Sequence, residues 1–233
     1  MLKRIIDILI SSAIVFFTSQ ILLIFAILIW KYDNYSPLYK APRVGKNFKI
    51  FTMIKLRSMS HNADKLGVNS TSNNDSRITP IGKYVRKFKI DEFTQMINVL
   101  LGDMSLVGPR PNVLSEVKMY TGKENNLLKV KPGVTDFSSI IFSDEGAILS
   151  DKKDPDKSYN LLIRPWKSRL GLFYIKKSSV VLDLLLILIT GIAIFSRKIA
   201  LALNTKILIF LNAPEELIKV SKRETELIPT DPP

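Results

Sequence analysis

The chain has 233 residues and a formal net charge of +13 at pH 7. Such a charge favours polyanionic partners, whether nucleic acid, anionic lipid or nucleotide phosphates. It contains no cysteine, which excludes disulfides, thiolate nucleophiles and thiolate metal sites. His61 is its single histidine, so any metal would have to bind oxygen ligands, which points to Mg²⁺ or a similar hard cation.

The first predicted element is an apolar segment from residue 8 to residue 30 that carries no charge. It is long enough to cross a hydrocarbon core of roughly 30 Å. Basic residues lie on both sides of it, beginning with Lys3 and Arg4, and they draw both ends toward the cytoplasmic face. A helix that turns back at the polar run Thr18-Ser19-Gln20 satisfies this tendency better than a straight one. We therefore expect residues 1–32 to form a re-entrant membrane helix hairpin, with a spanning helix as the alternative.

Residues 33–195 are predicted to form a small α+β, mostly helical domain. Residues 37–59 have the pattern of a β-hairpin, whose second arm places Lys55 and Arg57 on one face. A polar stretch without periodicity follows over residues 60–76. A loop of this length is usually mobile or functional.

Two helices with a carboxylate pair between them come next. Thr79 and Pro80 mark the start of the first helix. The second has apolar residues at helical spacing up to Gly102 and carries Asp91 and Glu92 in its first turn. Taken alone, such a pair is most often structural, because acidic residues at a helix start offset the helix dipole.

Basic residues around the pair change this interpretation. The candidate phosphate-binding residues are Lys55, Arg57, Arg77, Arg86 and Arg110. Arg110 lies between two prolines, and a stiff backbone suits a bidentate contact with phosphate. A helix N-terminus also attracts phosphate and favours an ionised carboxylate at Asp91. The block therefore suits chemistry on phosphates. By contrast, we expect Arg43, Lys83 and Lys87 to contact lipid headgroups or solvent.

The last third of the chain is predicted to be helical. Residues 161–177 are expected to form an interfacial amphipathic helix with its aromatic residues at membrane level. Residues 180–195 are apolar but short for a span, and Asp183 would be costly in lipid. This favours a buried or interfacial helix over a second span. Residues 196–233 are expected to form a helical extension and a flexible tail.

Over roughly residues 3–183 the chain resembles the bacterial sugar transferases, the monotopic phosphoglycosyl transferases. The resemblance is strongest over RIT, IGKYVRK, DEFTQMINVLLGDMSLVGPRP and KPGVTDF. It implies transfer of a sugar 1-phosphate from a nucleotide diphosphate sugar to polyprenyl (undecaprenyl) phosphate. It further implies that Asp91 is the nucleophile, forming a covalent aspartyl phosphosugar, and that Glu92 and Mg²⁺ assist. Asp91 and Glu92 are then the expected metal ligands.

The chain departs from the family pattern at a few positions. Lys89 and Thr94 stand where the family usually has serine and proline. After KPGVT the sequence is DFSSIIFSDEG in place of the commoner version containing glycine and tryptophan. We expect this segment, residues 136–146, to affect the choice of sugar.

The resemblance and the charge pattern predict a place at the bacterial inner (cytoplasmic) membrane, with the domain on its cytoplasmic face and anionic lipid as a further partner. An inactive scaffold of the same fold is one alternative, against which the intact Asp91-Glu92 pair argues. A membrane-anchored nucleic-acid-binding protein is another. No helix-turn-helix, zinc-finger or RNA-recognition pattern supports it, and we expect no nucleic acid as a partner.

Overall fold

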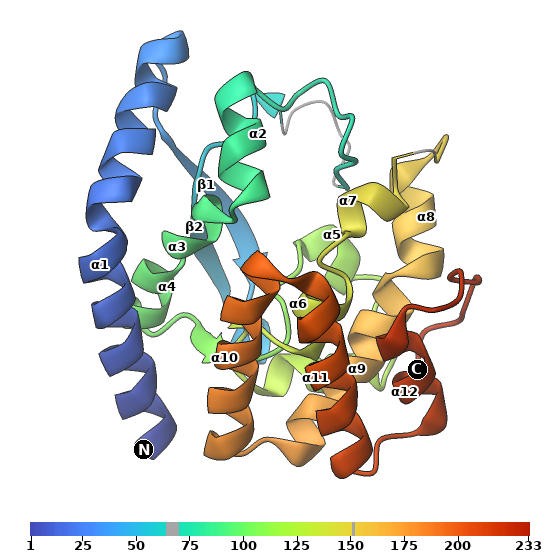
Figure 1. Ribbon diagram of the computed structural model, residues 1–233. Coiled ribbons are helices and arrows are strands. Elements are labelled where there is room, and N and C mark those ends of the chain that lie inside the picture. Colours follow the sequence, from blue (N-terminus) through green and yellow to red (C-terminus); the bar gives the residue numbers. More distant parts are fainter. Residues whose placement is uncertain (64–69, 151) are drawn as a thin grey trace.

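The computed structural model describes residues 1–63, 70–150 and 152–233. The described part is mostly helical with two small sheets (Figure 1), which confirms the α+β, mostly helical class. The helices are α1 (Leu2–Asp33), α2 (Pro80–Lys87), α3 (Ile90–Phe93), α4 (Met96–Leu101), α5 (Leu114–Val117), α6 (Phe137–Ile141), α7 (Glu145–Ile148), α8 (Pro155–Leu162), α9 (Arg164–Lys177), α10 (Val180–Phe195), α11 (Arg197–Phe210) and α12 (Glu215–Lys222), with 3₁₀ helices η1 (Lys46–Phe48) and η3 (Glu124–Lys129). The strands are β1 (Leu38–Val44), β2 (Ile50–Leu56), β3 (Ser105–Val107) and β4 (Gly133–Thr135).

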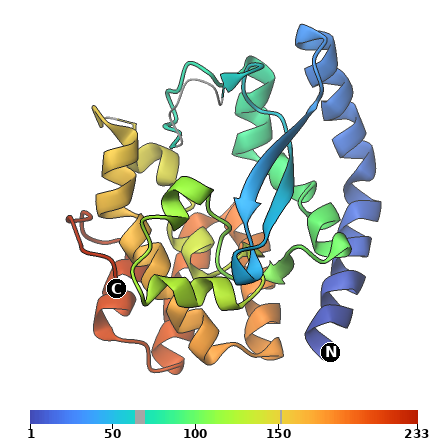
Figure 2. The same ribbon diagram turned by 180° about the vertical axis from the view of Figure 1, so that it is seen from behind.

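The predicted β-hairpin is present. β1 and β2 pair antiparallel, with Leu38 opposite Leu56 at the open end, and the hairpin crosses one side of the molecule (Figure 2). On β2 the buried face carries Phe51 and Met53, and Lys55 follows them in the alternation. Lys55 therefore points inward. Of the predicted polar loop that comes next, residues 64–69 lie outside the described residues.

α2 begins where the sequence predicts. The Thr79 side chain accepts a hydrogen bond from the Gly82 N–H at 2.9 Å, and Pro80 occupies the first turn. The predicted second helix is present as α3 and α4, joined by two residues that keep helical backbone angles. Gly102 ends α4 with φ 90°, a left-handed conformation that glycine adopts without strain. Asp91 lies in the first turn of α3, as predicted.

Side-chain hydrogen bonds hold α3 and α4 against β2. The Asn98 amide donates to the Thr52 carbonyl at 2.7 Å and accepts from the Ile54 N–H at 2.9 Å. The Thr94 hydroxyl donates to the Ile54 carbonyl at 3.1 Å. These bonds attach the helical segment to the strand that carries Lys55, so they set the distance between Lys55 and α3.

A parallel pair of short strands fixes the segment around Arg110. β3 pairs with β4, and beyond the ladder the Gly108 N–H donates to the Thr135 carbonyl at 3.0 Å. The two backbones approach so closely that a Cβ on Gly133 would lie 2.0 Å from the Gly108 nitrogen. The Gly133 N–H also donates to the Pro109 carbonyl at 3.0 Å. The residue before Arg110 is thus tied to β4.

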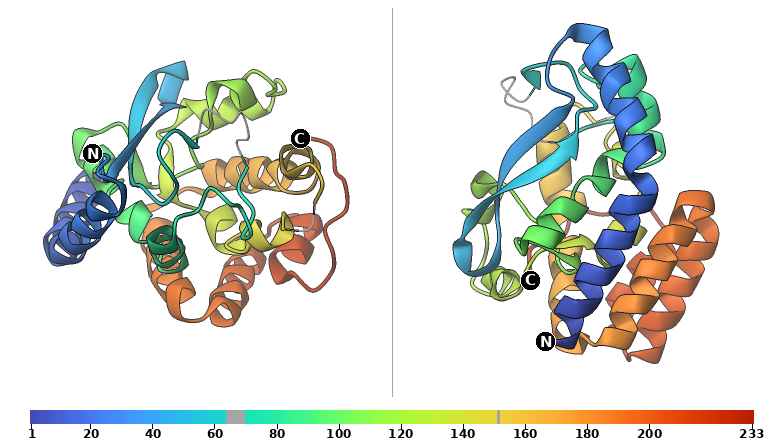
Figure 3. Two further views of the ribbon diagram at one scale, coloured as in Figure 1. Left: turned by 90° about the horizontal axis from the view of Figure 1, so that it is seen from above. Right: turned by 90° about the vertical axis from the view of Figure 1, so that its left-hand side faces the viewer.

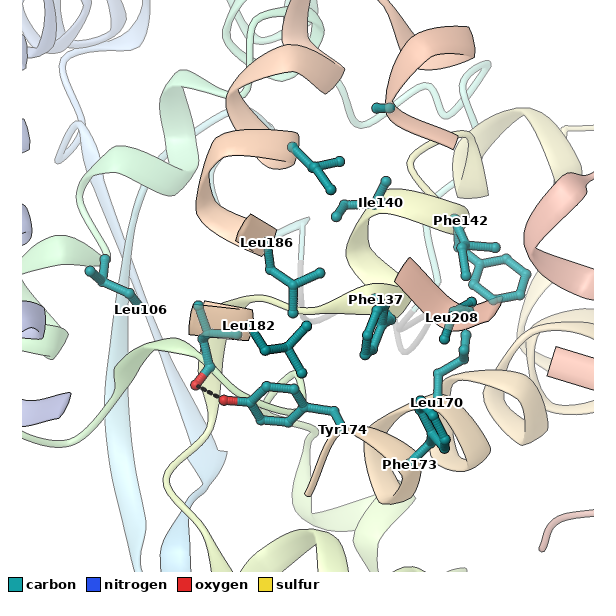
Figure 4. Packing of buried hydrophobic residues seen from close by; sticks show 14 of the residues in the cluster. Leu106, Phe137, Ile140, Phe142, Leu170, Phe173, Tyr174, Leu182, Leu186 and Leu208 are labelled. Atoms are coloured by element: carbon teal, nitrogen blue, oxygen red, sulfur yellow. Dashed lines mark hydrogen bonds between the residues drawn. The ribbon is translucent and has the colours of Figure 1, made fainter. Parts of the chain in front are cut away.

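The main hydrophobic core lies between α6, α9, α10, α11 and α12. Figure 4 shows Phe137 at its centre, with Leu186 from α10 and Leu170 from α9 nearby. The prediction that residues 161–177 form a helix at the membrane interface is therefore wrong. Phe173 and Tyr174 are buried in this core, because α9 is covered by neighbours on several sides, including α6, α8, α12 and η3.

α10 is one-sided. It buries Leu182, Leu186 and Ile189, whereas Val181 and Leu188 on its other side are exposed. With 16 residues it falls short of a span, in line with the prediction of a buried or interfacial helix. The following helices α11 and α12 add side chains to the same core.

α1 is a continuous helix of 32 residues, the one described helix that is long and apolar enough to cross a membrane. The bend predicted at its polar run is not present. The hydroxyls of Thr18 and Ser19 donate to the carbonyls of Ile14 and Phe16, so these residues satisfy their own hydrogen bonding inside the helix. The length and apolar surface of this helix suggest a membrane location.

Both ends of α1 are attached to the rest of the molecule (Figure 3). Near its start, Lys3 donates to Asp183 on α10 at 2.5 Å. Asp7 accepts a hydrogen bond from the Leu106 N–H at 3.0 Å. At its end, Asp33 pairs with Arg57. Between these contacts most of the helix surface is exposed and apolar.

Candidate active site

A cavity of about 1040 Å³ lies between the β1–β2 hairpin with α2 and α3 on one side and α5, α7, α8 and α9 on the other. Every residue predicted for the site lines it, namely Lys55, Arg57, Arg77, Arg86, Asp91, Glu92 and Arg110. Among the described lining residues, lysine and arginine side chains outnumber carboxylates. The cavity is therefore suited to an anionic ligand.

Asp91 and Glu92 meet a common lysine. The Lys55 Nζ lies 3.4 Å from Asp91 Oδ2 and 3.9 Å from Glu92 Oε1. The two carboxylate side chains are 15% and 21% exposed, so both are reachable from the cavity yet largely shielded from solvent. Although they are adjacent in a helix, the two carboxylates converge on one point of the cavity.

Arg110 binds the second carboxylate. Its Nη2 donates to Glu92 Oε1 at 3.0 Å, and its side chain is 34% exposed. Burial by itself raises the pKa of Glu92, but the positive charges of Arg110, Lys55 and Lys89 lower it to about 2. Glu92 is therefore ionised at neutral pH and accepts hydrogen bonds or binds a cation.

Two of the predicted phosphate contacts are engaged elsewhere. Both terminal nitrogens of Arg57 donate to Asp33, at 2.5 and 2.6 Å, and its Nε donates to the Ser36 carbonyl at 2.8 Å. Arg77 forms a similar pair with Asp75, at 2.7 Å. Although both arginines line the cavity, their guanidinium groups already hold carboxylates. The geometry favours a structural role for both over contact with a phosphate.

Other basic residues are available to a ligand. Arg86 is half-buried in the cavity wall and forms no ion pair with the described residues. Arg43, Lys83 and Lys87, which the sequence suggested for headgroups or solvent, also line the cavity. Position within the fold, and not local sequence context, brings these residues to the site.

The opposite wall consists mostly of residues that the sequence did not single out. Glu116 on α5, Glu145 on α7, Tyr159 on α8 and Lys167 on α9 all line the cavity, and Lys167 forms an ion pair with Glu145. Glu145 belongs to the segment that we expected to affect sugar choice. The other three carry no local signal, because each sits in a separate element distant from the 91–111 block.

The site can accept a hard cation in one particular way. Among the described residues there is no group of three or more His, Asp or Glu side chains that could hold a metal. Asp91 and Glu92 supply oxygen ligands on the same side of the cavity. Mg²⁺ commonly binds one or two carboxylates and completes its shell with water and substrate phosphates. The donor set fits Mg²⁺ arriving with a phosphorylated substrate.

The sequence model of the bacterial sugar transferase family matches residues 1–197. The chain therefore belongs to that family. A relative from Klebsiella pneumoniae, named UDP-glucose:undecaprenyl-phosphate glucose-1-phosphate transferase, is 34% identical over 203 residues, covering 85% of this chain and 41% of the relative. The undecaprenyl-phosphate galactose phosphotransferase of Salmonella typhimurium is 36% identical over 149 residues, covering 58% and 31%.

A third relative, the uncharacterized sugar transferase EpsL of Bacillus subtilis, is 37% identical over 153 residues, covering 65% of this chain and 73% of the relative. The chain thus spans most of one of these three relatives but less than half the length of the other two.

Proposed function

We propose that this protein transfers a sugar 1-phosphate from a nucleotide diphosphate sugar to polyprenyl phosphate, initiating a bacterial surface glycan or glycoconjugate. The observation that carries the proposal is the convergence of Asp91, Glu92, Lys55 and Arg110 in one basic cavity. The names of the relatives support it, since two of them specify undecaprenyl phosphate and a sugar phosphate.

The reaction proceeds in two displacements. A carboxylate oxygen of Asp91 attacks the β-phosphorus of the donor, and the bond from that phosphorus to the bridging oxygen breaks. Nucleoside monophosphate leaves with the electron pair. An oxygen of polyprenyl phosphate then attacks the phosphorus of the aspartyl phosphosugar, and the Asp91 carboxylate leaves. Lys55 and Arg110 offset the negative charge that gathers around the phosphorus.

The two carboxylates take different roles in this scheme. Asp91 is the nucleophile, and it forms an ion pair with Lys55 at 3.4 Å, a contact loose enough to be exchanged. Glu92 is held by Arg110 at 3.0 Å. Glu92 and Asp91 are the residues that would hold Mg²⁺, which when bound neutralises charge on the donor diphosphate.

The test uses an aspartate-to-asparagine substitution and a donor labelled in the sugar. Without acceptor lipid, wild-type protein should retain label at Asp91 and release nucleoside monophosphate. Asp91→Asn should retain none and should lose several orders of magnitude in turnover, with an unchanged melting temperature. Glu215→Gln, on the exposed start of α12, is the matched control and should behave as wild type. A ternary-complex rate law without labelled protein would overturn the covalent step.

The same proposal places α1 in the membrane with the domain on the cytoplasmic face, where nucleotide sugars are made. Both ends of α1 contact one body, through Lys3–Asp183 and Asp33–Arg57. A helix held in this way cannot carry its two ends to opposite sides of a bilayer while those contacts last. We infer that α1 lies with its exposed apolar surface in the lipid.

Single cysteines test this arrangement, because the chain has none of its own. Cysteines at positions 2 and 34 should both resist an impermeant thiol reagent in intact cells and react after lysis. Labelling at position 2 alone in intact cells would establish a spanning helix and overturn the placement.

A further inference from the structure

The wall of the cavity opposite Asp91 has a distinct chemistry. It combines a carboxylate, an ammonium group and a phenol within a small space, since Lys167 pairs with Glu145 and its Nζ lies 5.1 Å from the centre of the Tyr159 ring. Glu116 adds a second carboxylate to this wall. α5, α7, α8 and α9 each contribute one of these residues, so the group exists only in the folded chain.

Polar groups on the cavity wall lack partners within the protein. Tyr159 is 7% exposed, and its hydroxyl makes no hydrogen bond to the described residues. Gln95 also lines the cavity, is 2% exposed, and its Nε2 has no partner in the described part of the chain. Buried polar groups in native proteins are nearly always hydrogen-bonded. The unpaired Gln95 amide therefore points to a ligand in the cavity, and the Tyr159 hydroxyl, which has no partner among the described residues, is free to bind one.

The protonation states of Tyr159 and Glu145 suit hydrogen bonding to the hydroxyl groups of a ligand. Burial raises the pKa of Tyr159, and the nearby Glu145 and Glu116 raise it further, so its hydroxyl can donate. Burial also tends to raise the pKa of Glu145, but Lys167 lowers it below the ordinary value, so this carboxylate accepts. The wall therefore offers both an acceptor and donors.

The position of this wall indicates which part of a nucleotide diphosphate sugar would lie against it. Its carboxylates repel phosphate, so the diphosphate belongs at the opposite wall. Arg110 lies between the two walls, because its charge interacts with Glu92 on one wall and with Glu145 on the other. In a nucleotide diphosphate sugar the sugar is attached directly to the β-phosphate, whereas the nucleoside is one phosphate further away. The group next to the β-phosphate is the sugar.

We propose that Glu145, Tyr159 and Lys167 form a subsite that binds the hydroxyl groups of the donor sugar and contributes to the choice of sugar. This inference rests on the proposed function, and it narrows the expectation for residues 136–146 to Glu145. The Glu145 carboxylate accepts from sugar hydroxyls, while the Tyr159 hydroxyl and the Lys167 ammonium donate to them. The nucleoside stays outside the subsite.

Binding measurements distinguish contacts to the sugar from contacts to the nucleotide. Affinities for UDP and for a panel of UDP-hexoses and UDP-N-acetylhexosamines are measured in the Asp91→Asn background, where donor is not consumed. For the donor that binds best, Tyr159→Phe and Glu145→Gln should each weaken binding about tenfold, the effect of one hydrogen bond to a charged or buried group. Binding of UDP should change less than about twofold, because UDP lacks the sugar.

Tyr159→Phe removes one oxygen and serves as the conservative variant if Glu145→Gln lowers the melting temperature. Glu215→Gln is again the control. An equal loss for UDP and UDP-sugar would assign the wall to the nucleotide, and unchanged binding of both would remove it from the site. Either result overturns the proposal. Because binding is measured without turnover, absence of transferase activity in wild type counts against the proposed function and leaves this test intact.

Discussion

Arg110 and Arg57 have the same predicted role and line the same cavity, yet the fold gives them different partners. Arg110 pairs with Glu92, whose side chain is 21% exposed. Arg57 is 7% exposed and donates from both terminal nitrogens to Asp33, the last residue of α1. The first arrangement leaves a guanidinium group beside the candidate catalytic carboxylates. The second fastens the end of α1 to the β1–β2 hairpin.

The comparison shows what a basic cluster in a sequence can and cannot indicate. It marks the residues that gather around a site, because like charges are brought together only where an anion can offset them. It does not show which of them are already neutralised by the protein. For Arg57 that depends on a carboxylate at the end of another element.

Removal of the divalent cation should have the largest effect on turnover. It should act on the carboxylates of the cavity and not on the Asp33–Arg57 pair. Chelation should abolish turnover, because two carboxylates and a diphosphate repel one another without a cation between them, and added Mg²⁺ should restore it. The melting temperature should not change, since the Asp33–Arg57 pair needs no metal. Full turnover in excess chelator would exclude a metal from the mechanism.

Arg110→Lys should lower kcat/KM about 10- to 100-fold, corresponding to one hydrogen bond to a charged group, worth about 1.5–3 kcal/mol. A lysine keeps the charge but not the planar fork. The release of nucleoside monophosphate measures the loss, and the melting temperature serves as the control for folding. Turnover close to that of wild type would give Arg110 the same structural role as Arg57.

Arg57→Met should show the smallest effect on turnover and a clear effect on stability. It leaves the Asp33 carboxylate with only the Tyr35 N–H as a partner among the described residues. This should lower the free energy of unfolding by about 3 kcal/mol, the lower end for a buried pair, since Asp33 is partly exposed. Specific activity of the folded fraction should stay within about twofold. A large loss of activity in a stable variant would return Arg57 to phosphate binding.

Elements with strong local signals were predictable. Thr79 and Pro80 start α2 because the cap and the fixed proline angle act within one turn. Gly102 ends α4 through its left-handed backbone. The antiparallel hairpin also follows from local turn and strand propensity. In each case the determining interaction spans only a few residues.

Two predictions were wrong because they depended on what surrounds a helix in the folded protein. The bend in α1 was inferred from a polar run, but its hydroxyls bond to carbonyls one turn back in the same helix. The interfacial position of α9 was inferred from aromatic residues, but Phe173 and Tyr174 are covered by other elements. The sequence of a helix shows which side chains are apolar and not whether lipid or protein covers them.

By itself the sequence determined the family, the secondary structure around the carboxylates, and the acidic and basic residues that line one side of the cavity, because these depend on a continuous motif and on helix and turn signals within it. The tertiary structure alone decided that Arg57 is held by Asp33, that both ends of α1 contact the rest of the molecule, and that Glu145, Tyr159 and Lys167 line the same cavity as Asp91. These features join residues far apart in the chain, and their positions follow from the packing of whole elements.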